Sequence, residues 1–473
     1  MLRKILSGLS WTFSERILAQ GASLLIAIIL ARLLTPDEFG LITIILIFIN
    51  VANIFVVNGF GEALIQKRDA DAIDFSTIFW ISFLFAVVLV VLIWILAPYI
   101  AIFYENANLT YPLRILSLKL ILSSLNSIQQ AYISKNLLFD LLFFSTLAGT
   151  VISAFIGITM AYMNCGVWAL VFQYMINSFI STSILCFYIN WRPQVCFSLT
   201  SAKTLIGFSW KITAAAVINE IYIQLRAIII GKIYTVSDLA FYNKGNMFPQ
   251  ALMTNVNVAI NKVFFPIMAK YNNDIPNLKV LLKRAIRSST FIAFPIVIFL
   301  VISADNIVLL LLTDKWVESI SYMRILCLFW IFQPMQTLNW QLLKAIGRSD
   351  ICLKLEILKK TIGIFLVVGT MLISVKALAI SAVVFAIISM LINMWPNRIL
   401  INYGIYEQMM DIIPCFIICF LSTILTYPIF VIDLSNIIKC LAKAFIFFTS
   451  YIFLLYIYSK RKGMDIKSFL TKQ

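Results

Sequence analysis

Long apolar segments alternate with short polar turns along nearly the whole chain. Most segments contain about 20 residues, the length at which an α-helix crosses the hydrocarbon core of a bilayer. Because they are continuously apolar and do not alternate with polar residues, they indicate membrane-spanning helices and not barrel strands. We predict about fourteen spans, near residues 12–34, 41–63, 76–98, 113–133, 141–162, 166–189, 209–232, 246–268, 289–311, 319–342, 355–374, 377–396, 410–430 and 437–458.

The composition supports this prediction. Hydrophobic residues make up 62% of the 473 residues and charged residues 12%, whereas an ordinary soluble domain has about 45–50% and 25%. A soluble core could not bury so much apolar surface, so we predict an all-α, polytopic integral membrane protein. Ser10, Glu15 and Arg16 interrupt the first apolar stretch, so we expect no cleavable signal peptide and a first span that is retained.

Basic residues concentrate in every second turn of the predicted topology. With a cytoplasmic N-terminus and C-terminus, the inward turns carry most of them, as the positive-inside rule requires. The formal net charge of +16 then indicates contact with anionic membrane lipids, and we expect no nucleic-acid partner. The inward turns contain Lys67, Arg68, Lys135, Arg192, Lys203, Lys270, Lys279, Lys283, Arg284, Arg287, Lys344, Arg348 and Arg398.

Two stretches about two hundred residues apart are similar to each other. "LARLLTPDEFGLI" follows the first span, and "IGKIYTVSDLAFY" follows the seventh, so that Thr35 matches Thr235 and Glu38 matches Asp238. In the first stretch we expect Thr35 to cap a helix that begins at Pro36. An even number of spans separates the copies, which predicts parallel repeats. We therefore expect a six-helix bundle at 1–190, a cytoplasmic linker at 191–208, a second six-helix bundle at 209–400 and, at 401–473, two extra helices with a basic cytoplasmic tail.

Polar side chains recur at helical spacing inside several spans. Such groups are costly in a membrane and by default mark a pathway. The narrowest arc is in the eighth span and consists of Asn246, Gln250, Thr254, Asn257 and Asn261. Further candidates are Arg16 and Gln20 in the first span, Asn53, Asn58 and Glu62 around the second, and Glu220, Gln224 and Arg226 in the seventh.

Two interpretations of these side chains remain open. They either form hydrogen bonds between tightly packed helices or line a cavity. For Glu220 we favour a cavity or a buried ion pair with Arg16 or Arg226. Arg114 and Lys119, at the start of the fourth span, are ambiguous between snorkelling to the membrane surface and a role inside the membrane.

Signals for enzyme chemistry are weak. The chain has no histidine, the commonest general acid, base and metal ligand. Asp69 and Asp71 lie in a short loop without an evident pocket, and no nucleotide-binding motif is present. The eight cysteines show no spacing typical of disulfides or zinc. We expect no enzyme activity, no metal site and no cofactor.

Two signatures near the N-terminus resemble a known family. "ARLLTPDEFGLITI" at 31–44 and "GFGEALIQKRD" at 59–69 are similar to Wzx-type polysaccharide-unit flippases. "WRPQVCFS" at 191–198 and "FSWKI" at 208–212 resemble the linker and seventh span of the same family. This family is part of the multidrug/oligosaccharidyl-lipid/polysaccharide (MOP) exporter superfamily, and the resemblance is closest to its colanic-acid-exporter-like branch.

The resemblance implies alternating access by two six-helix bundles in the bacterial cytoplasmic membrane. The implied substrate is an undecaprenyl-pyrophosphate-linked oligosaccharide for O-antigen, capsule or exopolysaccharide assembly, and the implied partners are a polysaccharide polymerase and a chain-length regulator. In such relatives spans one, two, seven and eight line the cavity. Arg16 and Arg226 would then suit the pyrophosphate, and Asn53, Gln250, Asn257 and Asn261 the glycan. Glu62 and Glu220 would be available to carry a coupling proton or sodium ion.

Two other functions are compatible with parts of the sequence. A drug/cation antiporter of the same superfamily (MATE-like) would share the repeat, but it should have a smaller pocket and twelve spans. A membrane polysaccharide polymerase usually needs a large external loop, whereas the longest outward turn here, near 233–245, has about a dozen residues.

Overall fold

The computed structural model describes most of the chain as helices. It covers residues 2–57, 61, 64, 71–136, 138–189, 191–272, 274–432 and 435–461, except for the side chains of 1–17, 139, 204, 208, 211, 212, 430 and 431. Every element assigned in these ranges is helical, which confirms the all-α prediction. The helices form two compact units, Met1–Ala240 and Phe241–Gln473.

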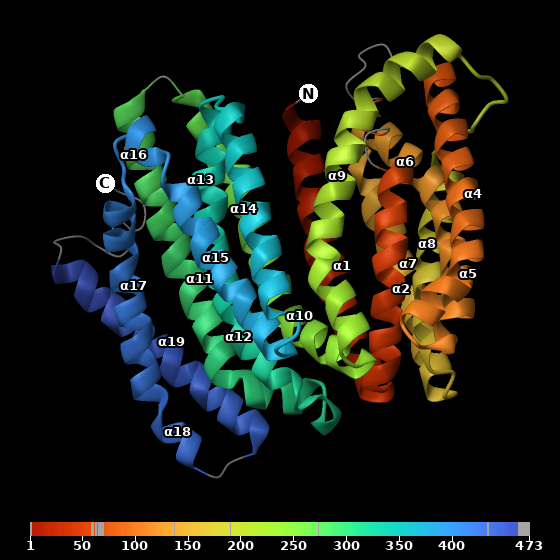
Figure 1. Cartoon of the computed structure of the whole chain (residues 1–473). Coiled ribbons are helices and arrows are strands. Elements are labelled where there is room, and N and C mark those ends of the chain that lie inside the picture. The colour runs from red at the N-terminus through yellow and green to blue at the C-terminus, as the bar shows by residue number, and fades with distance from the viewer. Residues whose placement is uncertain are drawn as a thin grey trace. The chain divides into compact units, whose positions relative to one another are not determined.

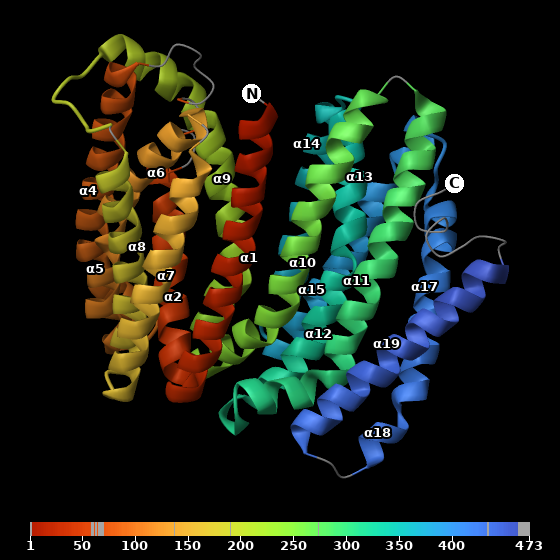
Figure 2. The ribbon, with the colours of Figure 1, turned by 180° about the vertical axis from the view of Figure 1, so that it is seen from behind.

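The described part of the first unit consists of long helices, with short helical segments between α4 and α6 (Figure 1). Its elements are α1 (Leu2–Leu33), α2 (Pro36–Val57), α4 (Ala72–Phe103), η1 (Ala107–Leu109), α5 (Thr110–Ser117), α6 (Lys119–Asn136), α7 (Phe139–Tyr162), α8 (Val167–Tyr188) and α9 (Leu199–Ile233). α1 lies along α7, and α7 packs against α8 (Figure 2). α9, which we expected to begin the second bundle, contacts α2 and α4 in this unit. The proposed repeat boundary at 209 stays a prediction.

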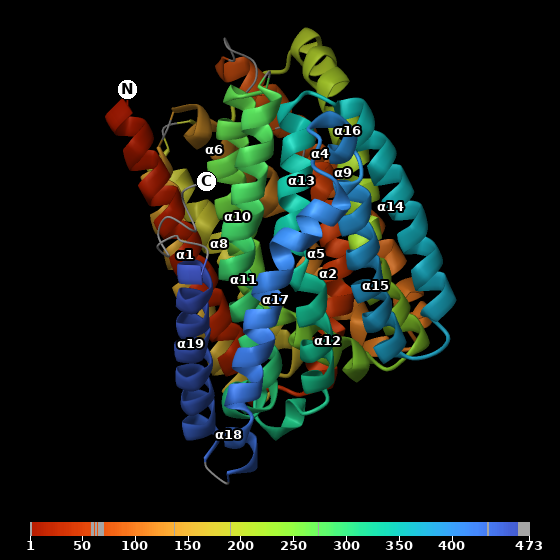
Figure 3. The ribbon, with the colours of Figure 1, turned by 90° about the vertical axis from the view of Figure 1, so that its left-hand side faces the viewer.

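The second unit begins within α10. Its elements are α10 (Val236–Lys270), α11 (Ile275–Leu311), η2 (Asp314–Trp316), α12 (Ser319–Ile331), α13 (Gln333–Ala345), α14 (Ser349–Thr370), α15 (Val375–Met394), α16 (Asn397–Leu400), α17 (Ile405–Thr426), α18 (Pro428–Val431) and α19 (Asn436–Arg461). α12 and α13 follow each other along one predicted span and are separated at Phe332 (Figure 3). α19 packs against both α11 and α17.

Ten helices in the described ranges are long and apolar enough to cross a membrane, so the chain is a multi-pass membrane protein. The predicted number of fourteen is not confirmed, for three physical reasons. The spans at 113–133 and 319–342 are each interrupted, at Leu118 and Phe332. The described apolar part of α1 is only Leu18–Leu33, and α14 carries four charged residues between Lys354 and Lys360.

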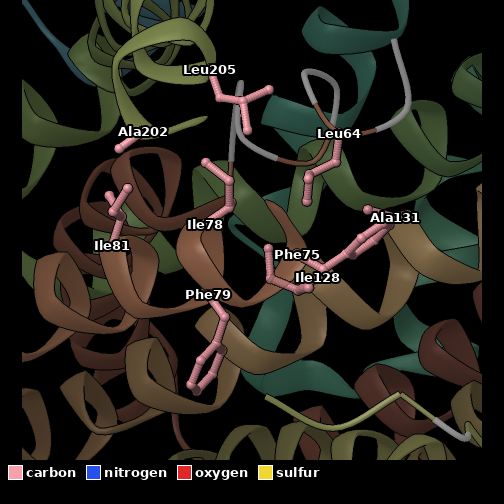
Figure 4. Close-up of a cluster of buried hydrophobic side chains, with 9 residues drawn as sticks. All are labelled: Leu64, Phe75, Ile78, Phe79, Ile81, Ile128, Ala131, Ala202 and Leu205. Carbon is pink, nitrogen blue, oxygen red and sulfur yellow. The ribbon is translucent and has the colours of Figure 1, made fainter. Parts of the chain in front are cut away.

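The predicted linker, residues 191–208, is hydrogen-bonded to α4 in the first unit. Trp80 on α4 donates its indole N–H to the carbonyl of Gln194 at 2.8 Å, and the Gln194 N–H donates to Ser76 at 3.1 Å. The linker ends earlier than expected, because Ser198 caps α9, which begins at Leu199. Beside it, side chains from α4, α6 and α9, together with Leu64, form a buried apolar cluster (Figure 4). Its members are Leu64, Phe75, Ile78, Phe79, Ile81, Ile128, Ala131, Ala202 and Leu205.

The two similar turns of the predicted repeat have the same capping chemistry. Thr35 N–H donates to Glu38 Oε2 at 2.7 Å, and Glu38 N–H donates to Thr35 Oγ1 at 3.4 Å. At the second turn, Thr235 and Asp238 make the corresponding pair of bonds, at 3.2 and 3.0 Å. α2 begins at Pro36, as the sequence predicted. Each capping box satisfies N–H groups that a helix start leaves without an intrahelical partner.

These two turns also touch each other within the first unit. The Ser237 hydroxyl donates to the Asp37 carboxylate. A Cβ added at Gly40 would lie 2.0 Å from the carbonyl oxygen of Val236, so only glycine allows this approach of the two backbones. The start of α2 is therefore fixed to the start of α10 by a contact that leaves no room for a side chain.

The two extra helices predicted at the C-terminus are fastened to α11 by buried polar contacts. Arg287 on α11 donates from Nε and Nη2 to Asp411 Oδ1 on α17, at 3.1 and 2.6 Å. Tyr403 donates to the other oxygen of Asp411 at 2.6 Å. Burial, with this hydrogen bond, raises the pKa of the Tyr403 hydroxyl, which keeps it a neutral donor. On α19, Lys443 donates to Ile302 O at 3.1 Å and to Asn306 Oδ1 at 2.7 Å.

We predict that Gly40→Ala destabilises the protein by about 1–3 kcal/mol, because the added methyl group forces the backbones of α2 and α10 apart. The measurement is the free energy of unfolding in mixed micelles. Gly369→Ala in α14 is the matched control: a Cβ there meets nothing within 4 Å, and alanine favours a helix by up to about 1 kcal/mol. Equal stability of the two variants would contradict the close contact.

We predict that Asp411→Ala lowers the free energy of unfolding by about 3 kcal/mol, because Arg287 then loses the counter-charge for a mostly buried guanidinium. The control is Asp350→Ala. Asp350 accepts a hydrogen bond from Arg348 that lowers its pKa to about 2, but both side chains are about half exposed. An exposed ion pair contributes little to stability. An equal loss of unfolding free energy in the Asp350 and Asp411 variants would therefore contradict a special role of the Arg287–Asp411 pair in holding α17.

Candidate functional site

The amide arc predicted on α10 lies against α12 and α13. Trp330 Nε1 donates to Asn246 Oδ1 at 2.7 Å, Thr337 Oγ1 donates to Asn257 Oδ1 at 3.4 Å, and Gln341 Nε2 donates to Asn261 Oδ1 at 2.7 Å. The three donors are spaced by seven and four residues, and residues at this spacing share one face of a helical span. The structure thus gives these asparagines the helix–helix role that was one of the two open interpretations.

Some polar groups of the amide arc on α10 are still available for hydrogen bonds to a ligand. Asn257 and Asn261 use their oxygens toward the neighbouring helix, and their Nδ2 groups have no further partner within the described residues. Gln250 is exposed, and its Oε1 accepts a hydrogen bond from Asn246 at 3.0 Å. Packing and ligand contact are therefore compatible on this face.

Glu220 on α9 is half-buried and accepts a hydrogen bond from Gln224 Nε2 at 2.8 Å. The two residues are one helical turn apart and lie on the same face. Arg226, six residues after Glu220, is also half-buried, but six residues turn the helix by about 600°, so it points away from Glu220. The expected pairing of Glu220 with Arg16 falls outside the described side chains.

The candidates on the first two spans have separate environments. Gln20 on α1 is exposed, and Asn53 on α2 is half-buried. The side chain of Arg16, and the residues Asn58 and Glu62, lie outside what the structure describes. Asn53 Oδ1 is buried without a hydrogen-bond partner among the described atoms, and at membrane depth such an acceptor calls for water or a ligand.

Asn53 belongs to a polar cavity inside the first unit, which we call the N-terminal pocket. Its volume is about 270 Å³, and its walls come from α2, α6, α7 and α8. α6 contributes Lys119, Ser123, Asn126, Ser127 and Gln130. α2 contributes Asn53 and Val57, α7 contributes Leu142, Ser145 and Thr146, and α8 contributes Asn177, Ser178, Ser181 and Leu185.

The polar residues of this pocket recur at helical spacing in the sequence. On α6, Ser123, Asn126, Ser127 and Gln130 follow Lys119 by four, seven, eight and eleven residues. This spacing places all five on one face of the helix. The α8 residues Asn177, Ser178 and Ser181 have similar spacing. Single serines in apolar spans are ordinary helix-packing residues, so periodicity alone gave them no priority.

Comparison with known proteins connects this architecture to glycan assembly. A model of the family described as "polysaccharide biosynthesis protein" matches residues 29–321. The lipopolysaccharide biosynthesis protein WzxC of Escherichia coli (strain K12) is 24% identical over 362 residues, covering 75% of this chain and 73% of that protein. The teichuronic acid biosynthesis protein TuaB of Bacillus subtilis (strain 168) is 25% identical over 410 residues, covering 85% and 83%.

A solved structure has the same fold over nearly the full length. The lipid II flippase MurJ, in an inward closed conformation, superposes with a TM-score of 0.78 and covers 96% of this chain and 99% of that one. The sequences are only 13% identical, so this similarity concerns the fold. It includes the region of the two extra C-terminal helices.

We predict a favourable coupling of about 0.6 kcal/mol between Asn261 and Gln341, the typical size for a hydrogen bond between membrane helices. The measurement is a double-mutant cycle on unfolding in mixed micelles, with Asn261→Ala, Gln341→Ala and the combined variant. Asn257 with Thr337 is the comparison pair and should couple more weakly, because its 3.4 Å separation is longer. Additive effects for Asn261 and Gln341 would show that they do not interact in the membrane protein.

Proposed function

Because the chain belongs to the polysaccharide biosynthesis protein family, we propose that it is a flippase that moves a lipid-linked oligosaccharide across the membrane. The family match carries this proposal, since it extends over 29–321 and so includes helices of both units. The protein is accordingly a transporter and not an enzyme. O-antigen, capsule or exopolysaccharide assembly would use its product.

The polar groups inside the helices are suited to the chemistry of a lipid-linked oligosaccharide. A glycan carries many hydroxyl groups that cannot enter hydrocarbon without partners, whereas its lipid tail is stable there. The free amides of Asn257 and Asn261 and the exposed Gln250 are suited to the glycan. We assign pyrophosphate binding to Arg16 and Arg226, because guanidinium groups pair well with phosphate oxygens.

A transported polar group also requires a source of energy. Glu62 and Glu220 are the acids we propose for coupling to a proton or sodium ion, since an ionisable group at membrane depth by default has a function. Glu220 is half-buried and bonded to a neutral amide, Gln224, so its charge has no cationic partner among the described residues. Such a carboxylate is suited to binding a cation.

We place the protein in the bacterial cytoplasmic membrane with both termini in the cytoplasm. The support is the distribution of basic residues, which lie mainly in alternate turns. A polysaccharide polymerase that consumes the translocated unit, and a chain-length regulator, are the protein partners that we propose. Anionic lipids would contact the basic inward turns.

We expect that deleting the gene makes lipid-linked oligosaccharide accumulate in the cytoplasmic leaflet, because synthesis continues while translocation stops. The measurement is the accessibility of the labelled lipid-linked unit in spheroplasts and in inverted vesicles. Reintroduced wild-type protein should restore export.

Two outcomes would contradict the flippase. Unchanged glycan export together with altered drug resistance would favour the drug/cation antiporter. Formation of polymer from lipid-linked units by the purified protein would favour a polymerase.

A further inference from the structure

Among the described residues that line the N-terminal pocket, one is a cation and none is an acid. Lys119 is the charged one. Within the described part of the chain, no carboxylate oxygen lies within ion-pair distance of Lys119, and its Nζ lies over the ring of Tyr174, 5.6 Å from the centroid. A ring face attracts a cation, but it does not neutralise the charge. The described lining of the pocket is therefore electropositive and suited to an anion.

Most of the other lining residues carry neutral hydrogen-bonding groups, and Val57, Leu142 and Leu185 are apolar. From Lys119 to Gln130, the polar face of α6 rises through eleven residues, about 16 Å at 1.5 Å per residue. A monatomic ion needs only a few ligands at one point, so a face of this length indicates a larger ligand with several hydroxyl groups. The orphaned Oδ1 of Asn53 and the side chains of α8 supply further acceptors and donors.

Charge and volume limit the ligand further. A single lysine balances one negative charge, whereas a pyrophosphate carries more than one and would need additional cations. The volume of about 270 Å³ lies at the small end of ligand sites, which are typically about 300–1,000 Å³. It suits one sugar residue and not a whole oligosaccharide.

We propose that the N-terminal pocket binds an acidic sugar of the transported oligosaccharide, with Lys119 as the counter-charge of its carboxylate. The amides and hydroxyls of α6 and α8 would hydrogen-bond the sugar hydroxyls. The site would select glycans that contain a uronic acid, because a neutral sugar leaves Lys119 without a partner. This inference rests on the proposed flippase function.

The test measures binding of D-glucuronate and D-glucose to the purified full-length protein in detergent by saturation-transfer NMR. Glucuronate should bind more tightly than glucose. Lys119→Gln keeps most of the side-chain length but removes the charge, so it should weaken glucuronate binding about tenfold to a hundredfold, the size of a hydrogen bond to a charged group. It should leave glucose binding unchanged, and Lys119→Arg should retain the preference for glucuronate.

Two further variants separate the site from general effects on folding. Lys244→Gln removes a buried lysine that, like Lys119, lies over an aromatic ring, that of Trp316 at 5.4 Å, and it is outside the pocket. It should leave glucuronate binding unchanged. Ser178→Leu fills the pocket without removing the charge and should weaken both sugars.

The proposal is overturned if Lys119→Gln binds glucuronate as the wild type does, or if glucuronate and glucose bind equally. It is also overturned if chloride or inorganic phosphate displaces glucuronate at equal concentration, because the site would then recognise a simple anion. The flippase assay is independent of these results. Glucuronate binding that depends on Lys119, in a protein that does not translocate the lipid-linked unit, would contradict only the flippase function. Translocation by a protein without such binding would contradict only the proposed sugar site in the N-terminal pocket.

Discussion

Every polar group at membrane depth needs a partner, because hydrocarbon offers no hydrogen bonds. This constraint accounts for the main polar contacts within each unit. On α10 the amide oxygens accept bonds from Trp330, Thr337 and Gln341. On α6 and α8 many side chains are paired internally, for example Asn126 Nδ2 with Thr182 Oγ1 at 3.3 Å. The groups left over, such as Asn53 Oδ1, are where water or substrate is required.

Basic residues have two different roles in this protein. By sequence, Lys279, Lys283 and Arg287 form part of an inward turn that sets orientation. In the structure they also hold α17, because Lys279 pairs with Glu407 at 2.8 Å and both Lys283 and Arg287 face Asp411. The positive charges from which we predicted the orientation thus also fasten an extra helix.

Interruptions of helices lie beside several of the candidate site residues. The predicted fourth span is divided at Leu118, and Lys119 begins the second segment. The predicted tenth span is divided at Phe332, and its two segments present Trp330 on one side of the break and Thr337 and Gln341 on the other. Breaks in membrane helices are tolerated where protein or a cavity satisfies the backbone, and in both spans polar side chains lie beside the break.

The sequence by itself determined the class of the protein, because length and continuous hydrophobicity specify membrane helices with little help from tertiary contacts. It also determined both capped turns, at Thr35 and Thr235, since a capping box involves residues only three positions apart. The polar arc on α10 was predictable from its 3.6-residue period.

Only the tertiary structure decided what those polar faces meet. Periodicity assigns Asn257 and Asn261 to a face, but their partners Thr337 and Gln341 are eighty residues away. Lys119 was ambiguous by itself, and it became a candidate when α2, α7 and α8 closed a polar pocket around it. Gly40 likewise needs to be glycine because of Val236. A single sequence records local spacing, whereas a binding site depends on contacts between segments that are distant in the chain.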